Sequence, residues 1–256
     1  MSGLGTLTRK ELMESLRTRR LPVVVVLFAG LGILSVLTAR YLSEILELAL
    51  GDQAGAIPIP DPTVADAVTE LQQNIGQFGA LTAIVLAMGT VAWERERGTA
   101  AFILTKPASR AAFLAAKIVA LGAVLGIATA TAAAVAWAYT AVLFEPLPPA
   151  GWVVMTVLVW VGLMAWASVT FLASTVLRSA AAAAGVGIVA VLGLPLASAI
   201  PTVGRWLPPG LDGPANAVAR GATFDAAGLL SALAGTTAII GGSTLAAWLV
   251  FRRQEL

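Results

Sequence analysis

Long apolar stretches alternate with short charged or proline-containing segments along this sequence. A helix needs about 20 apolar residues to cross the hydrocarbon core of a bilayer, so each long stretch predicts a membrane-spanning helix. We expect six such spans, over residues 22–39, 75–93, 110–144, 151–177, 180–200 and 226–251. The expected fold class is therefore an all-α polytopic membrane protein, with residues 1–256 forming a single membrane domain.

The first 20 residues predict a helix with an apolar and a charged face. Leu12 and Leu16 share the apolar side, and the segment ends on the cations Arg17, Arg19 and Arg20. Such an interfacial helix is expected to lie along the inner membrane surface, in contact with the lipid bilayer. A cleaved signal peptide is the alternative. The apolar run that follows is longer than the core of a normal signal peptide, so we expect the segment to be retained as part of the protein.

Two segments are expected outside the membrane. Residues 51–74 predict an extracellular loop and a helix whose N-cap is Asp61 and whose first residue is Pro62. A separate outer helix is favoured here over a lead-in to the second span. Residues 201–225 hold four prolines and the charged side chains Arg205, Asp212, Arg220 and Asp225, which predicts a further outer loop.

Basic residues predict the orientation in the membrane. With the amino terminus inside, thirteen Lys and Arg residues fall in inner segments, and Arg40, Arg205 and Arg220 remain outside. The excess of basic residues in the inner segments predicts a protein of the cell membrane with both termini in the cytoplasm. A net charge of +2 could indicate nucleic-acid binding, but the cations flank apolar spans, so membrane orientation explains them more simply.

The densest charge cluster follows the second predicted span. Glu94, Arg95, Glu96 and Arg97 occur in succession, which requires the membrane to end there. A short apolar piece then precedes a proline, and it is too short to span a bilayer. The cluster and the piece continue as Gly98, Thr99, Phe102, Ile103, Leu104, Lys106 and Pro107. Ser109 is placed to cap a helix that begins at Arg110.

This arrangement resembles the first cytoplasmic loop of ABC-2 type permeases, the membrane subunits of ATP-driven (type V-like) exporters. The resemblance rests on the charge run, Gly-Thr, the short apolar piece, Lys-Pro-x-Ser-Arg, and Lys117 seven residues later. It implies a coupling helix at about residues 97–105, within a cytoplasmic coupling loop over 94–109 that docks on a separate ATPase subunit. The implied contacts are Glu94, Arg95, Glu96, Arg97, Gly98, Thr99, Phe102, Ile103, Leu104, Lys106, Pro107, Ser109 and Arg110. An ordinary solvated loop is the alternative.

The chain carries few of the groups used in catalysis. It has no Cys, no His and no phosphate-binding G-x-x-x-x-G-K-[ST] motif, so we expect neither a metal site nor a nucleotide site in this chain. The resemblance places ATP and Mg in the partner ATPase, and it implies two permease subunits, as a homodimer, with two ATPase copies. The predicted spans lack ionisable residues at their middles, which disfavours an ion-coupled carrier. A membrane scaffold without transport activity is the third alternative.

Small residues are frequent in the third, fifth and sixth predicted spans. They include Gly185, Gly187, Gly241 and Gly242. Because small residues allow helix backbones to approach closely, we expect these spans to pack against protein more than lipid. Pro195 is expected to bend the fifth span. An apolar pathway would suit lipids, hydrophobic drugs or peptides, and the sequence does not distinguish them.

Overall fold

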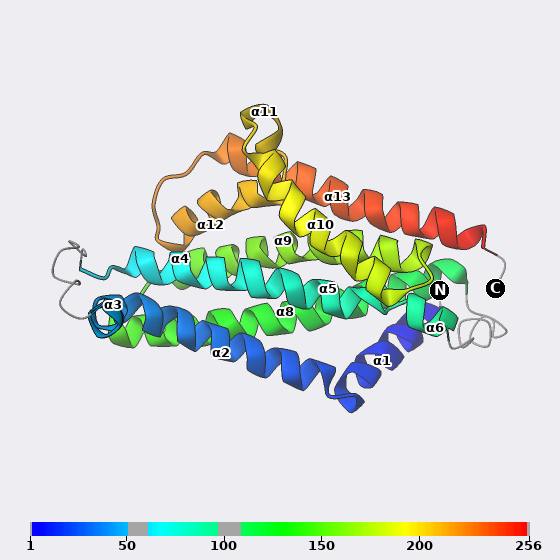
Figure 1. Ribbon diagram of the computed structural model, residues 1–256, viewed down its shortest axis with the longest axis horizontal. Coiled ribbons are helices and arrows are strands. Elements are labelled where there is room, and N and C mark those ends of the chain that lie inside the picture. The colour runs from blue at the N-terminus through cyan, green and yellow to red at the C-terminus, as the bar shows by residue number, and fades with distance from the viewer. Residues whose placement is uncertain (1, 51–60, 97–108, 255–256) are drawn as a thin grey trace.

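The computed structural model describes residues 2–50, 61–96 and 109–254 (Figure 1). Every regular element within these ranges is helical. Six helices are long and apolar enough to cross a membrane, namely Arg20–Arg40, Val64–Glu94, Arg110–Leu143, Pro149–Val176, Ala180–Ser198 and Ala226–Arg253. The prediction of an all-α polytopic membrane protein with six spans is confirmed.

Within the described residues, seven helical elements precede residue 97. In chain order they are α1 (Ser2–Arg17), α2 (Arg20–Arg40), α3 (Leu42–Leu50), α4 (Val64–Asn74), the π-helix η2 (Ile75–Gly79), α5 (Ala80–Met88) and α6 (Ala92–Glu96). The second half holds the long helices and a folded connection. Its elements are α8 (Arg110–Leu143), α9 (Pro149–Val176), α10 (Ala180–Ser198), α11 (Pro201–Gly204), the 3-10 helix η3 (Pro208–Leu211), α12 (Asp212–Ala219) and α13 (Ala226–Arg252).

Helix α9 is the centre of the bundle. It packs against α5, α8, α10, α12 and α13, and Met155, Leu163 and Phe171 on it are fully buried. Helix α2 lies along α8 instead (Figure 1). A Cβ atom at Gly32 would lie 2.5 Å from the carbonyl oxygen of Ala132, so this glycine is what lets the two helix backbones approach.

The second span differs from its prediction. Helix α4 continues through η2 into α5, so the separate outer helix that the sequence favoured is the first part of one long helix. The expected start at Pro62, with Asp61 as N-cap, is also wrong. Thr63 is the N-cap, and its amide and hydroxyl donate to the Asp66 carboxylate at 2.8 and 2.7 Å. This reciprocal capping box satisfies more of the first amides than Asp61 could have done.

The small-residue helices α10 and α13 are the most exposed spans of the chain. Half of the most apolar window of α8 is buried, against 17% for α10 and 11% for α13. A Cβ at Gly187 would meet Thr170 and Ile84, but one at Gly185, Gly241 or Gly242 would meet nothing within 4 Å. The expectation of close packing holds for α8 and only in part for α10 and α13, which pack along α9 but leave most of their apolar windows exposed within one chain. Helix α10 continues through Pro195 to Ser198.

The connection between α10 and α13 is folded rather than a simple loop. It contains α11, η3 and α12, and we call residues 199–225 the connecting segment. It packs against α4, α9, α10 and α13. The backbone of Trp206 lies so close to Gly235 that any larger residue would clash. The connecting segment therefore has a fixed position over the helices that it joins.

Candidate coupling and binding sites

Lys117 is the centre of a charge cluster that joins three helices. It lies on the second turn of α8, and only 4% of its side chain is exposed. Its Nζ donates to Glu94 Oε1 of α6 at 2.8 Å and to both carboxylate oxygens of Glu11 of α1 at 3.2 Å. A buried ammonium is tolerated only when it is paired, so this cation fixes α1 and α6 onto α8.

Lys10 adds a more exposed cation to the same cluster. Its Nζ lies 3.2 Å from Glu11, 3.5 Å from Glu14 and 3.9 Å from Glu94. Partial burial acts to lower the pKa of Lys10, but these carboxylates together outweigh it and raise the pKa. In this cluster two ammonium groups are paired with three carboxylates. We call it the Lys117 cluster.

The helix that leads into the predicted coupling loop is held by neighbouring helices. The amides of Val91 and Ala92, at the start of α6, donate to the buried Ser174 hydroxyl of α9 at 3.2 and 3.1 Å. The Arg20 guanidinium lies over the Trp93 ring, 5.3 Å from its centroid. These contacts position Glu94 against Lys117.

The helix that follows the loop is held at its first residues. Ser109 caps α8 as predicted, accepting a hydrogen bond from the Ala112 amide at 3.1 Å. Arg110 Nη1 donates to the carbonyl oxygens of Phe251, Arg252 and Gln254 at 3.2, 2.9 and 2.8 Å. Carbonyls at a helix end lack the usual intrahelical partners, and a guanidinium satisfies them well.

The end of α13 is also joined to other helices. Phe113 of α8 stacks on Phe251 with ring centroids 5.6 Å apart, and both rings are buried. Gln254 donates from Nε2 to the Thr175 carbonyl of α9 at 3.1 Å. Figure 1 shows α1, α6 and the end of α13 gathered at one end of the bundle. We call this the charged end.

The predicted site residues fall into three groups. Glu94, Ser109 and Arg110 have the contacts given above. For Arg95 and Glu96 the structure describes the backbone, within α6, and residues 97–108, with Arg97, Gly98, Thr99, Phe102, Ile103, Leu104, Lys106 and Pro107, lie outside the described residues. The predicted first helix forms as α1, which ends at Arg17, and its interfacial position stays a prediction. Leu12 is half-buried, and Leu16, Arg17, Arg19 and Arg20 are exposed.

Sequence reasoning missed the partners that complete the Lys117 cluster. Glu11 is 106 residues from Lys117 along the chain, and Ser174 is more than 80 residues from α6. The available signal was a lysine at the start of a span and an acidic residue within an otherwise basic helix. Neither indicates which residue pairs with which, because the pairing depends on how α1 folds back over α8.

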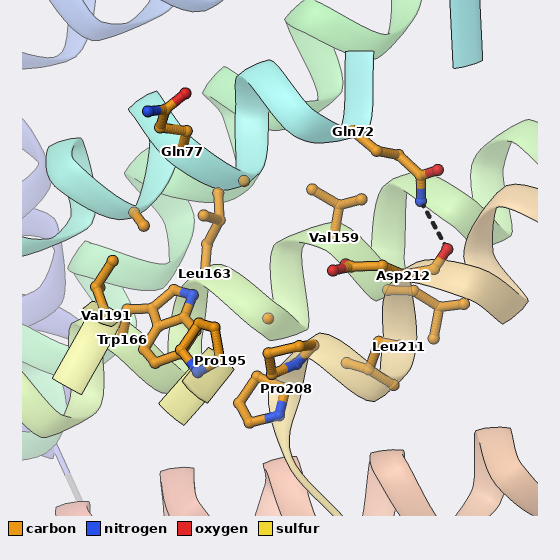
Figure 2. Close-up of a pocket in the computed structure, with 15 residues that line it drawn as sticks. Gln72, Gln77, Val159, Leu163, Trp166, Val191, Pro195, Pro208, Leu211 and Asp212 are labelled. Atoms are coloured by element: carbon orange, nitrogen blue, oxygen red, sulfur yellow. Dashed lines mark hydrogen bonds between the residues drawn. The ribbon is translucent and has the colours of Figure 1, made fainter. Parts of the chain in front are cut away.

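A cavity of about 290 Å³ lies away from the charged end, where α4, η2 and α5 face α9, α10 and the connecting segment. Figure 2 shows its walls. Most of the lining is apolar and the polar groups are few. The lining residues are Gln72, Gly76, Gln77, Ala80, Leu158, Val159, Gly162, Leu163, Trp166, Val191, Pro195, Pro208, Pro209, Leu211 and Asp212.

Asp212 is the charged residue in the wall of this cavity. Its backbone carbonyl accepts a hydrogen bond from Gln72 Nε2 at 3.2 Å, while its side chain extends in the other direction, into the cavity (Figure 2). Asp212 is an exposed residue, but nearby protein atoms partly bury its carboxylate. This burial raises the pKa of Asp212 from 3.8 to about 6.

Two comparisons bear on the family of this chain. The sequence profile described as "ABC-2 family transporter protein" matches residues 6–216. The chain is also 27% identical over 214 residues to the uncharacterized transmembrane protein YxlG of Bacillus subtilis (strain 168), with 81% of each chain covered. The family match includes α1, the first five spans and most of the connecting segment, and it agrees with the resemblance seen at residues 94–117. This multi-pass membrane protein therefore belongs to the ABC-2 family of transporter proteins.

Proposed function

We propose that this chain is the permease subunit of an ATP-binding cassette exporter in the cell membrane, driven by a separate cytoplasmic ATPase. The observation that carries the proposal is the way residues 97–108 are attached. Glu94 before them and Arg110 after them are both fixed by side-chain contacts at the charged end. A segment attached so firmly at both ends is suited to pass force from a docked protein to the helices.

The attachments suggest which helices would move together. Glu94 is joined through Lys117 to α8 and α1, and Arg110 is joined to the end of α13. A displacement of the coupling helix would therefore move α1, α8 and the end of α13 first, and the centre of α9 only afterwards. Hydrolysis of ATP, with Mg, would take place in the partner, and this chain would supply the pathway. We assign no catalytic role to its residues.

A second permease subunit is part of the proposal. Helices α10 and α13 are mostly uncovered in one chain, although both are rich in small residues that suit helix contacts. A homodimer would cover part of this surface, and two ATPase copies would then bind below. Both termini and the 94–109 loop are proposed to face the cytoplasm, because the basic residues concentrate there.

The experiment is affinity purification of the tagged chain from its native membrane. A cytoplasmic ATPase with a phosphate-binding motif should copurify, and the complex should hydrolyse ATP. The chain purified alone should show neither ATPase activity nor a nucleotide-dependent rise in melting temperature, since its sequence lacks that motif. Specific ATP hydrolysis by the isolated chain would contradict the proposal.

A further inference from the structure

The cavity in Figure 2 has one charged group on an otherwise apolar wall. Asp212 is the one charged residue among the described residues that line it. No ion pair of Asp212 is seen within the described ranges, whereas the lysines and glutamates of the charged end are paired. On the cavity side the carboxylate faces mostly apolar residues, so a cation of the right size would supply the charge partner that this wall lacks.

The backbone at Asp212 is held in place by neighbouring hydrogen bonds. Gln72 donates to the Asp212 carbonyl, and Gln72 Oε1 accepts from Asn216 Nδ2 at 2.9 Å. Asn216 also donates to Thr69 Oγ1 at 3.1 Å. These contacts join α4 to α12 on either side of Asp212. The acid is therefore presented to the cavity by a fixed backbone rather than by a free loop, which favours binding.

The opposite wall suits the apolar part of a ligand. In Figure 2 the indole of Trp166, with Pro195 and Val191, lies across the cavity from Asp212. An indole ring attracts cations through its face and packs against alkyl or aryl groups. The volume of about 290 Å³ is at the small end of the range for ligand pockets. A small molecule therefore fits better than a lipid with long acyl chains.

We propose that this cavity binds a small organic cation with an apolar body, such as a hydrophobic amine, whose charged group pairs with Asp212. This inference rests on the proposed function for its meaning as a transport substrate, but binding itself requires neither ATP nor the partner. An anion would be repelled by Asp212. A metal ion would find one carboxylate, and the described residues contain no cluster of three metal-ligating acids, cysteines or histidines.

Competing charges are remote from Asp212 within the described part of the chain. Helices α5, α9 and α10 and the 3-10 helix η3 carry no titratable side chain. On α4, Asp66 and Glu70 line a different hollow with Leu42 and Ser43. Arg205 lies over the Trp206 ring and is exposed, as is Arg220 after α12. The charge of the cavity is therefore set by Asp212.

The test uses the purified full-length chain in detergent, without ATPase or nucleotide. The probe is benzyltrimethylammonium, which is charged at every pH, and its neutral isostere is neopentylbenzene. Binding is measured by quenching of tryptophan fluorescence and by thermal shift. We expect the cation to bind the wild type, and Asp212→Asn to weaken that binding by at least about tenfold. Binding of the cation should strengthen as pH rises through about 6, because Asp212 ionises there.

Asp225→Asn is the matched control. Asp225 caps α13, lies in the same connecting segment and does not line the cavity. This variant should bind the cation as the wild type does, and Trp166→Leu should bind it more weakly. Equal binding of the cation and its neutral isostere, equal binding by Asp212→Asn and wild type, or no binding to the wild type would each overturn the inference. Such a result would leave the proposed coupling to an ATPase untouched, because no partner takes part.

Discussion

The charged end and the cavity differ in whether a charged side chain has a partner of opposite charge. At the charged end, Lys117 is almost fully buried, and two carboxylates lie within 3.2 Å of it. In the cavity, the Asp212 carboxylate faces apolar side chains, and the described residues give it no cation. The first arrangement removes the cost of burial, because each charge has a partner. In the second, the carboxylate has no such partner among the described residues.

This difference in charge pairing indicates a structural role for the charged end and a binding role for the cavity. A compensated cluster gains rigidity and has no remaining need for a charged ligand, which suits a region that transmits force. An uncompensated carboxylate lowers stability, and a protein retains such a group where a ligand supplies the missing charge. The two regions should therefore respond differently to reagents, to substitution and to pH.

The largest expected difference is access from outside the cell. If the charged end is cytoplasmic, Thr18→Cys should not react with an impermeant thiol reagent added to intact cells, whereas Thr223→Cys should react. Both threonines are exposed, one at the α1–α2 junction and one in the connecting segment. The chain has no native cysteine, so labelling reports these positions alone. Reaction of Thr18→Cys in sealed cells would reverse the proposed orientation.

The next largest effect is expected at Lys117. Lys117→Met leaves Glu11 and Glu94 close together without their buried cation, so we expect the free energy of unfolding to fall by about 3 kcal/mol. Lys10→Met, which removes a half-exposed cation from the same cluster, should cost less than about 1 kcal/mol. Denaturant unfolding in detergent measures both. Adding Glu11→Gln and Glu94→Gln to Lys117→Met should recover part of the loss, and a similar loss in both single variants would argue against a central role for Lys117.

A smaller effect is expected where Arg110 holds the end of α13. Arg110→Lys keeps the charge but loses the planar group that reaches three carbonyl oxygens, so we expect a loss of about 1–2 kcal/mol. Amide hydrogen exchange in the last turn of α13 should become faster. Arg253→Lys, at an exposed position on the same helix end, is the control and should change stability by less than about 0.5 kcal/mol. Unchanged exchange in Arg110→Lys would show that this contact does not fix the helix.

The smallest change in the free energy of unfolding is expected at Asp212. Here the wild-type carboxylate lowers stability, so substitution should raise it. Because burial raises the pKa from 3.8 to about 6, the folded protein binds a proton that the unfolded chain releases between these values. Stability contributed by this group is therefore full below about pH 4 and is lost as pH rises to about 6. Solvent in the cavity screens the charge, so we expect a loss of about 1 kcal/mol.

Substitution of Asp212 tests whether its carboxylate lowers the stability of the folded protein. Above pH 6, Asp212→Asn without ligand should be more stable than the wild type by about 1 kcal/mol, and the difference should vanish near pH 4. Asp225→Asn keeps an N-cap oxygen for the Ala227 amide but loses the negative charge at the start of α13, so it should lower stability slightly instead. Unfolding free energies at the two pH values check both. A wild type more stable than Asp212→Asn above pH 6 would mean that its carboxylate is already compensated.

The sequence was sufficient for the features that depend on local pattern. Apolar run lengths gave six spans, and Ser109 was identified as an N-cap from its place before Arg110. Features set by long-range contacts were not predictable. The Lys117 cluster joins residues more than 100 positions apart, and the cavity exists because the connecting segment folds back onto α4 and α9. Small residues on α13 indicated close packing, but one chain covers only part of this helix, along α9 and the connecting segment.

The most direct test of the proposed coupling concerns Phe102, which the resemblance places on the coupling helix. Burying an aromatic anchor at the centre of an interface often contributes about 2 kcal/mol or more, so Phe102→Asp should weaken binding of the ATPase by at least about thirtyfold. Phe224→Asp, the same change at an exposed phenylalanine before α13, is the matched control and should bind as the wild type does. Affinity is measured between the purified permease variants and the ATPase. If Phe102→Asp binds the ATPase as tightly as the wild type and still supports transport, residues 97–105 are not the coupling helix.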